Sequence, residues 1–377
     1  MSSFTPLATP LSNEIRMRRI RVLVDSHADE GLTNAQMSNA REIVRRLNSE
    51  RFEISIFHRG AADPRLAQRP NTRLVQLPQR RQTVTVLREF LWGKHDILFY
   101  LKVSPAARLY LSLRGILRDR RPIVGTIESQ CDFRNEPTIK PEDVRYWEHT
   151  ILRCDYLFSN SHSVKKSLQA EYGASSEVVP TGVDARVFTP DWKRPPNARP
   201  RVLFVGSLRP FKGPQLLLQA APRFPDADFV VVGDGMLASG LAKCVERERL
   251  ANVRLTGSLE ANRLREEYQR ADVFLFPSRW EGSPKVILEA AACGLPVIAR
   301  KDYEPETVID GQTGYLVASD AEVFVRLGEL LRRPELRRSL GQAGRKHAER
   351  FDWDPIVRRW EEIFLRLMLQ KGSHRLP

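Results

Sequence analysis

Residues 277–299 read PSRWEGSPKVILEAAACGLPVIA, a pattern of loop, helix and strand. Ser283 and Pro284 are typical of a helix start, and Gly294 with Pro296 is typical of a helix end. The helix between them is almost entirely apolar, so we expect it to be buried. Glu289 lies in the middle of this helix, and a buried carboxylate needs either a partner or a ligand.

A second carboxylate, Glu281, lies in the loop before the same helix. The free backbone N–H groups at a helix start favour an anionic ligand. The two glutamates therefore predict an anion-binding site around this helix start. The alternative is structural: Lys285 lies one turn before Glu289 and could satisfy it as an ordinary i,i+4 ion pair.

Short apolar strands alternate with helices on both sides of this stretch. In the second half we expect strands at 202–205, 229–232, 253–255, 273–276 and 297–299, and in the first half at 20–24, 53–57, 73–77, 96–101, 122–127 and 155–158. This alternation predicts an α/β protein with doubly wound parallel sheets. The proline-rich segment 189–200 is the predicted linker between domains at 1–188 and 201–354, with a C-terminal helix within 355–377 that returns to the first domain.

The loop after the strand at 202–205 contains two cations beside glycines. In the run VLFVGSLRPFKG (202–213), Arg209 and Lys212 follow Gly206. Open α/β sheets bind ligands at the carboxyl ends of their strands, where arginine and lysine suit phosphate. The alternative is that both are ordinary surface cations, because the chain carries a net charge of +14.

The run VVVGDGMLA (230–238) matches the G-x-G-x-x-A dinucleotide fingerprint and suggests a nicotinamide-dependent oxidoreductase as an alternative function. That fingerprint expects an acidic residue at the end of the next strand, where this chain has Thr256, Gly257 and Ser258. Two D-x-D triplets, at 226–228 and 352–354, read as turn and cap residues, so we expect no metal site.

The positive charge predicts an anionic partner, and nucleic acid is one alternative, although no zinc-finger or RNP-like motif supports it. Residues 59–121 hold 14 Lys/Arg against 4 Asp/Glu and include amphipathic helices predicted at 84–92 and 105–118. Such helices could lie on an anionic membrane surface, or their apolar faces could pack on the sheet. Four scattered cysteines and the lack of a signal peptide or a long apolar run predict a cytoplasmic protein. If the helices in 59–121 do bind a membrane, the protein would be peripheral at the inner membrane face.

Together these motifs resemble the family-four retaining glycosyltransferases, which have the GT-B fold. The matching stretches are 204–213, 231–235, 253–259, 271–299 and 310–317, with VVPTGVDARVFTP (178–190) before the linker. The resemblance implies two Rossmann-like domains that face each other across a cleft. It also implies metal-independent, retaining transfer of a sugar from a UDP- or GDP-linked donor to a glycan or lipid-linked acceptor in polysaccharide or glycolipid assembly, without a cofactor.

The resemblance also implies roles for individual residues. Arg209 and Lys212 would neutralise the donor diphosphate, Glu281 would hold sugar hydroxyls, and Glu289 would accept hydrogen bonds from the ribose. The remaining donor-binding residues would be Gly206, Gly282, Ser283, Pro284 and Lys285, with Gly257, Ser258 and Leu259 near the nucleobase.

The first domain departs from the family pattern at two places. The loop at 29–36, which is usually glycine-paired, has one glycine here, and it would supply Gly31, Leu32 and Thr33 on the acceptor side. His27, just after the first strand, is the other acceptor-side residue. Many members have a histidine after the strand at 122–127, where this chain has Glu128. An ionised carboxylate accepts hydrogen bonds but cannot donate them, so the usual histidine role would change.

Overall fold

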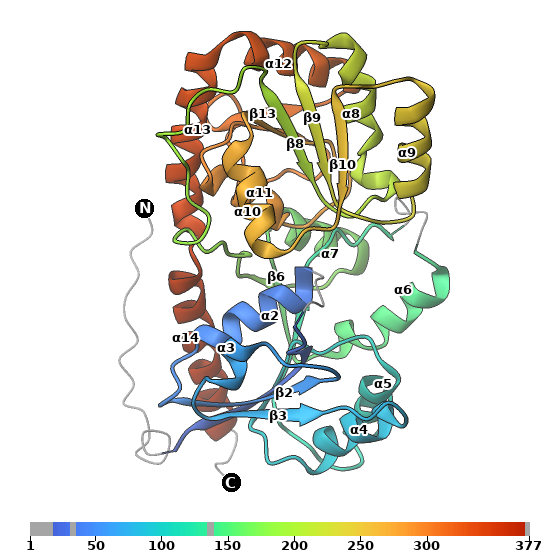
Figure 1. Cartoon of the computed structure of the whole chain (residues 1–377). Coiled ribbons are helices and arrows are strands. Elements are labelled where there is room, and N and C mark those ends of the chain that lie inside the picture. The colour runs from blue at the N-terminus through green and yellow to red at the C-terminus, as the bar shows by residue number, and fades with distance from the viewer. Residues whose placement is uncertain (1–17, 31–34, 134–138, 374–377) are drawn as a thin grey trace. The chain divides into compact units, whose positions relative to one another are not determined.

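The computed structural model describes residues 18–30, 35–133 and 139–373 (Figure 1). The chain divides into two compact units. The first comprises the residues up to 126, then 141–157 and those from 357 onward, and the second comprises 127–140 and 158–356.

The N-terminal sheet has the strand order β3-β2-β1-β4-β5-β6-β7, with parallel pairing. Its strands are β1 (Ile20–His27), β2 (Phe52–His58), β3 (Thr72–Gln76), β4 (Ile97–Phe99), β5 (Ile123–Ile127), β6 (Tyr156–Ser159) and β7 (Glu177–Val178). The helices in this half are α2 (Ala35–Arg46), α3 (Pro64–Ala67), α4 (Gln82–Trp92), α5 (Pro105–Leu113), α6 (Pro141–Glu148), η2 (Ile151–Arg153) and α7 (His162–Tyr172). The last helix, α14 (Trp353–Ser373), supplies Trp360 and Phe364, whose rings lie 4.8 and 5.0 Å from that of Phe99.

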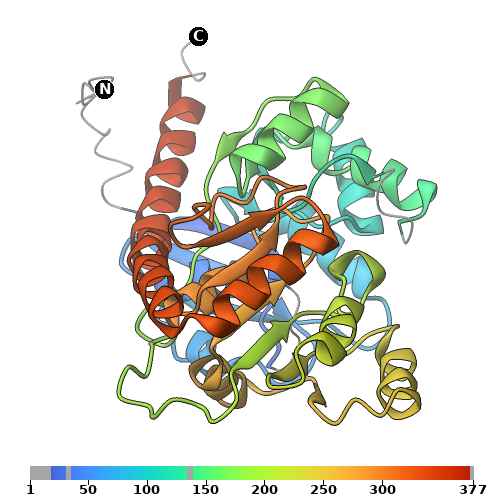
Figure 2. The same ribbon diagram turned by 90° about the horizontal axis from the view of Figure 1, so that it is seen from above.

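The second sheet repeats this order, as β10-β9-β8-β11-β12-β13, and is also parallel. Its strands are β8 (Arg201–Val205), β9 (Asp228–Val232), β10 (Val253–Gly257), β11 (Val273–Phe276), β12 (Val297–Arg300) and β13 (Gly314–Val317). Its helices are η3 (Pro210–Lys212), α8 (Gln215–Ala220), η4 (Ala221–Arg223), α9 (Ala238–Arg247), α10 (Ala261–Arg270), α11 (Lys285–Ala292), α12 (Asp320–Arg332), α13 (Pro334–Ala348) and η5 (Glu349–Phe351). Figure 2 shows the red helices covering the orange strands, and α12 packs against β11, β12 and β13.

The structure confirms the predicted α/β class, with two parallel sheets and α11 as a buried helix. Ile287, Leu288 and Ala290 of α11 are fully buried. The helix predicted at 105–118 is wrong at its end, because α5 stops at Leu113. Gly115 follows closely, and Arg118 has a left-handed backbone with φ 52°, which no α-helix continues through.

The basic helices α4 and α5 pack on the first unit's core. Phe90 of α4 and Tyr110 of α5 are fully buried, with ring centroids 5.3 Å apart. Their inner apolar faces therefore belong to the core, as the packing alternative predicted. In the part of the chain that the structure describes, no helix has both the length and the apolar composition to cross a bilayer.

Candidate active site

The loops after β8 and β11 lie beside each other in the second unit because these two strands are neighbours in the sheet. The connections from β8 and β11 lead away on opposite sides of this point, which is where open α/β sheets bind ligands. The first loop contains Gly206, Arg209 and Lys212. The second contains Glu281, followed by Gly282 and α11.

Lys212 and Glu281 form an ion pair across these two loops. Both side chains are mostly buried, with 16% and 11% of their surfaces exposed. The Ser278 hydroxyl donates a second hydrogen bond to the same carboxylate oxygen, Oε1 of Glu281, over 2.6 Å. The structure thus brings together two of the residues predicted for the site, which lie 69 positions apart in the chain.

Two aromatic rings lie close to the ammonium group of Lys212. Its Nζ lies 5.2 Å from the ring centre of Phe211 and 5.4 Å from that of Phe276. A cation near an aromatic face is attracted by the ring's quadrupole. Lys212 is therefore a positioned cation rather than a freely moving surface charge.

Arg209 is exposed, at the start of η3. Its guanidinium has no hydrogen-bond or ion-pair partner among the described residues. In contrast to Lys212, this predicted site residue keeps all of its donors available for a ligand.

Glu289 is buried in α11, and its partner comes from another helix. The Tyr268 hydroxyl, on α10, donates to Oε2 of Glu289 over 3.0 Å. Burial raises the pKa of Glu289, while the charge of Lys285 and the Tyr268 hydrogen bond act in the opposite direction. The sequence offered Lys285 or a ligand as the partner of this acid, and it gave no signal for Tyr268, which lies 21 positions away.

Gly282 lies directly against the backbone of another segment. A Cβ atom at this position would overlap the carbonyl oxygen of Glu128 and lie 2.7 Å from Oδ1 of Asn160. The Ser161 hydroxyl donates to the Gly282 carbonyl over 3.3 Å. The structure therefore places Glu128 beside the start of α11, together with Asn160, which the sequence analysis missed.

Two buried polar atoms near this loop have no hydrogen-bond partner among the residues that the structure describes: Oδ1 of Asn160 and the hydroxyl of Tyr303. Burial raises the pKa of Tyr303 well above its usual value, and the negative charge of Glu281 adds to the shift. Buried polar atoms are normally hydrogen-bonded, so such atoms in a site are candidates for ligand contact. No sequence motif indicated Tyr303.

The glycines of the dinucleotide-like motif have a packing role. Gly233 and Gly235 have φ values of 139° and 152°, and a Cβ on either would overlap the loop after β8 at Gly206 or Leu208. The Gly233 amide donates to the Gly257 carbonyl over 2.9 Å, at the end of β10. The motif therefore lets three loops approach one another closely. Beyond Gly257, Ser258 is exposed and Leu259 packs against the core.

On the acceptor side predicted in the first unit, the structure describes His27. Burial and the charge of Lys102 lower its pKa to about 4, so it is a neutral imidazole near pH 7. Its Nδ1 lies 3.5 Å from Oδ2 of Asp29. Gly31, Leu32 and Thr33 lie outside the described residues.

The first D-x-D triplet, 226–228, lies at the amino end of β9, whereas the loop pair lies at carboxyl ends of strands. Asp228 begins β9, and Asp352 accepts a hydrogen bond from the Asp354 amide over 3.0 Å at the start of α14. Within residues 18–30, 35–133 and 139–373, no three His, Cys, Asp or Glu side chains are grouped as a metal site would require.

Two family models match consecutive parts of the chain. "Glycosyltransferase Family 4" matches residues 39–187, and "Glycosyl transferases group 1" matches residues 190–347. A GDP-mannose-dependent alpha-(1-6)-phosphatidylinositol monomannoside mannosyltransferase of Mycolicibacterium smegmatis is 30% identical over 326 residues, which cover 77% of this chain and 81% of the relative. The chain belongs to the family-four glycosyltransferases. This family assignment replaces the alternative that the chain is a nicotinamide-dependent oxidoreductase.

Other relatives are matched over a shorter part. A D-inositol 3-phosphate glycosyltransferase of Segniliparus rotundus is 33% identical over 226 residues, 54% of this chain and 50% of the relative. The chain thus spans about half the length of the first curated relatives that it matches.

Solved structures agree on the fold. A sucrose-phosphate synthase from Thermosynechococcus elongatus superposes with a TM-score of 0.77 at 19% identity, covering 94% of this glycosyltransferase and 100% of that chain. HepE from Anabaena, in complex with UDP and glucose, superposes with a TM-score of 0.73 at 18% identity, covering 92% and 99%. These similarities support the GT-B fold.

Proposed function

We propose that this glycosyltransferase transfers a sugar from a nucleotide-diphosphate donor to an acceptor hydroxyl, with retention of configuration at the anomeric carbon. The observation that carries the proposal is the Lys212–Glu281 ion pair, at the point where the loops after β8 and β11 meet. One cation for phosphate and one carboxylate for sugar hydroxyls lie together there, next to the start of α11.

In the proposed complex the donor separates this ion pair into two ligand contacts. Lys212 and the exposed Arg209 bind the diphosphate, and Glu281 accepts hydrogen bonds from the sugar hydroxyls. The amides of Gly282, Ser283 and Lys285, with Pro284 between them, flank the phosphate and the sugar. Glu289 accepts hydrogen bonds from the ribose, while its Tyr268 contact fixes the carboxylate orientation.

The proposed reaction is a front-face substitution, as the family resemblance implies. The bond between the anomeric carbon and the diphosphate oxygen breaks, and the acceptor oxygen bonds to the anomeric carbon on the same face of the sugar. The proton of the acceptor hydroxyl passes to the leaving diphosphate oxygen, which lies on that face. Negative charge grows on the leaving phosphate in the transition state, where Arg209 and Lys212 stabilise it. Both cations come from the protein, so we propose that the reaction needs no metal ion.

The donor nucleotide is UDP or GDP in this proposal. HepE was solved with UDP, and the mycobacterial relative is GDP-mannose-dependent. Gly257, Ser258 and Leu259 are proposed to border the nucleobase, with Gly206 near the diphosphate. Glu128 is proposed to face the donor sugar, because its backbone lies against Gly282.

The acceptor is proposed to be a glycan or lipid-linked alcohol, bound by residues 1–188 near His27 and the loop that contains Gly31, Leu32 and Thr33. The donor is proposed to bind residues 201–354, with 189–200 as the linker. Peripheral attachment to the inner membrane face is also proposed for the first unit. In support, Trp92 at the end of α4 and Ile116 after α5 are 75% and 80% exposed beside many arginines.

A melting-shift screen with UDP, GDP and their sugar conjugates tests the donor proposal, because a ligand that binds the folded state stabilises it by mass action. We expect one nucleotide series to raise Tm in the wild type and less in Glu289→Gln. Product analysis with the stabilising donor then tests the stereochemistry. No shift with any nucleotide sugar, or a product of inverted configuration, would contradict the proposal.

A further inference from the structure

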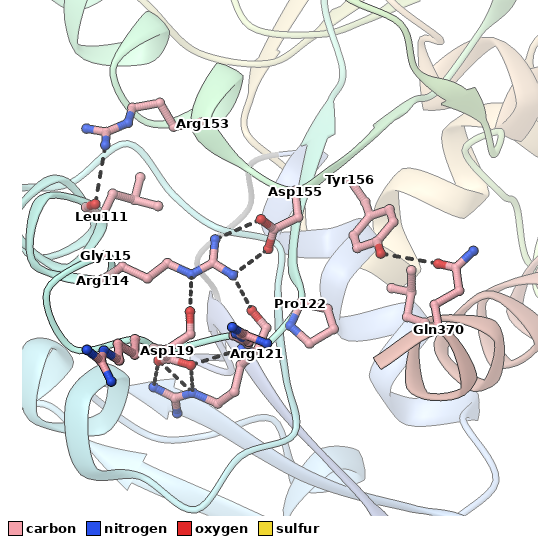
Figure 3. Close-up of a pocket in the computed structure, with 13 residues that line it drawn as sticks. Leu111, Arg114, Gly115, Asp119, Arg121, Pro122, Arg153, Asp155, Tyr156 and Gln370 are labelled. Carbon is pink, nitrogen blue, oxygen red and sulfur yellow. Dashed lines mark hydrogen bonds and ion pairs between the residues drawn. The ribbon is translucent and has the colours of Figure 1, made fainter. Parts of the chain in front are cut away.

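A cavity of about 1030 Å³ in the first unit is lined by five arginines (Figure 3). They come from the turn after α5 and from the segment before β6. The arginines are Arg114, Arg118, Arg120, Arg121 and Arg153, and the other lining residues include Asp119, Asp155, Tyr156 and Gln370. None of these residues belongs to the candidate active site described above.

Two of the arginines are fixed by carboxylates and form rigid walls. Arg114 binds Asp155 through two hydrogen bonds of 2.8 Å and also donates to the carbonyls of Asp119 and Arg121 (Figure 3). Arg121 binds the carboxylate of Asp119. Burial acts to raise the pKa of Asp119, but hydrogen bonds from Arg121 and Tyr110 outweigh it and lower the pKa to about 2. Asp119 therefore stays ionised, and the carboxylates of Asp119 and Asp155 are both occupied by these two arginines.

The other three arginines are not neutralised. Arg118 and Arg120 are exposed and have no side-chain partner among the described residues. Arg153 is also exposed and donates only to the Leu111 carbonyl, over 3.4 Å, as far as the described residues go. Five arginines against two carboxylates leave a surplus of three positive charges in one hollow. Positive charges gathered in a concave surface concentrate the electrostatic field and attract anions.

Neutral donors complete the lining. The Tyr156 hydroxyl donates to Oε1 of Gln370 over 3.2 Å, and this leaves the amide NH₂ of Gln370 as a further donor (Figure 3). Arg118 reaches the rim from a backbone with φ 52°, a conformation rare for a residue other than glycine. Strained backbone of this kind is often retained at binding sites.

We propose that this cavity binds a phosphate group, at a site separate from the donor site. Arginine presents a planar fork of donors that matches phosphate oxygens, and several forks around one hollow suit this anion better than a single carboxylate. The turn before β5 and the segment before β6 lie at the amino ends of their strands. The predicted acceptor-side residue His27, by contrast, is at the carboxyl end of β1. The proposed phosphate site and His27 therefore lie at opposite ends of the parallel strands of this sheet.

The phosphate could be free or part of a lipid headgroup. The neighbouring turn favours a headgroup, because Ile116 and Leu117 are 80% and 53% exposed between Gly115 and Arg118, which both line the cavity. Apolar side chains next to arginines are suited to a bilayer surface, where the former enter the acyl boundary and the latter bind phosphates.

The test compares two double variants that remove the same charge. Arg118→Ala/Arg120→Ala empties the cavity of two unpaired cations, and Arg80→Ala/Arg88→Ala removes two exposed arginines outside it. One measurement is the rise in Tm with inorganic phosphate. The other is co-sedimentation with phosphatidylglycerol vesicles, with phosphatidylcholine vesicles as the neutral reference. Arg120→Ala/Arg153→Ala serves as a second cavity variant that leaves the strained backbone at Arg118 unchanged.

We expect the cavity variants to lose about 2 °C of the phosphate-induced rise, or to bind anionic vesicles at least about fivefold more weakly than the control. Loss of the phosphate response alone identifies a free phosphate, and loss of vesicle binding identifies a headgroup. If the cavity and control variants respond equally in both measurements, the charge acts diffusely and the proposal is overturned. The Tm shift with UDP or GDP, measured in the same variants, reports on the donor site and keeps the two proposals separate.

Discussion

At the scale of single residues, the two cations of the site differ in what they contact before any ligand arrives. Lys212 is paired with Glu281 inside the loop junction, whereas Arg209 is exposed. Substitution of either cation should therefore lower catalysis, but only the substitution of Lys212 should also lower stability. We expect Arg209→Ala and Lys212→Ala each to lower kcat/KM by the equivalent of about 2–4 kcal/mol, the range for losing one preorganised donor.

Thermal melting of the same two variants distinguishes their structural contributions. Lys212→Ala leaves the mostly buried Glu281 carboxylate without its cation, so its Tm should fall clearly. Arg209→Ala removes no contact within the protein, so its Tm should equal that of the wild type. Wild-type kcat/KM in both variants would show that the diphosphate binds elsewhere.

Glu289 supports a second prediction at this scale. Glu289→Gln keeps the shape of the side chain and an oxygen for the Tyr268 hydroxyl but removes the charge. We expect it to weaken nucleotide binding about tenfold or more, as for the loss of a charged hydrogen bond. Isothermal titration with the nucleotide measures this. Tyr268→Phe is the matched comparison, because it removes the orienting contact but keeps the Glu289 carboxylate, and it should lower Tm and weaken nucleotide binding less than Glu289→Gln does.

At the scale of elements, the site depends on how closely the loops after β8, β9 and β10 approach one another. Gly233 has φ 139°, and a side chain there would overlap the Gly206 carbonyl. The backbone conformation alone costs about 1–3 kcal/mol for another residue, and the overlap adds to it. We expect Gly233→Ala to lower both Tm and nucleotide affinity.

Gly257→Ala is the control for this loop packing. Gly257 also has a positive φ, 70°, but no atom lies within 4 Å of the position of an added Cβ. Its Tm should therefore show only the smaller loss that the backbone conformation causes. Gly257→Ala is a control for Tm and not for nucleotide affinity, because Gly257 is proposed to border the nucleobase. Equal losses of Tm in both variants would show that the φ values, and not the approach of the loops, explain the glycines.

At the scale of the whole molecule, we propose that the chain itself supplies, through Arg209 and Lys212, the cations that a metal ion would otherwise provide at the diphosphate. We expect transfer to proceed unchanged in excess EDTA, with no stimulation by Mg²⁺ or Mn²⁺. A sugar-transfer assay on the full chain, dialysed against EDTA and then supplemented with each ion, measures this. Loss of activity in EDTA that either ion restores would assign part of the phosphate binding to a metal.

The sequence by itself determined the α/β class, both parallel sheets and the burial of α11, because apolar periodicity and helix-end residues are local signals. It also brought Lys212, Glu281 and Glu289 into consideration, through charged residues beside glycines and within an apolar helix. It placed the end of α5 too late, since the apolar pair Ile116 and Leu117 continues the helical pattern past the turn that Gly115 and Arg118 make.

Only the tertiary structure decided which groups meet. The Tyr268–Glu289 hydrogen bond, the Asn160 amide against Gly282 and the arginine-lined cavity each join segments far apart in the chain. Such pairings follow from the order of strands in the sheets and from side-chain directions after packing. No local sequence pattern encodes these pairings. The residues next to an arginine in the sequence do not show whether its side chain lines a cavity or lies on the solvated surface.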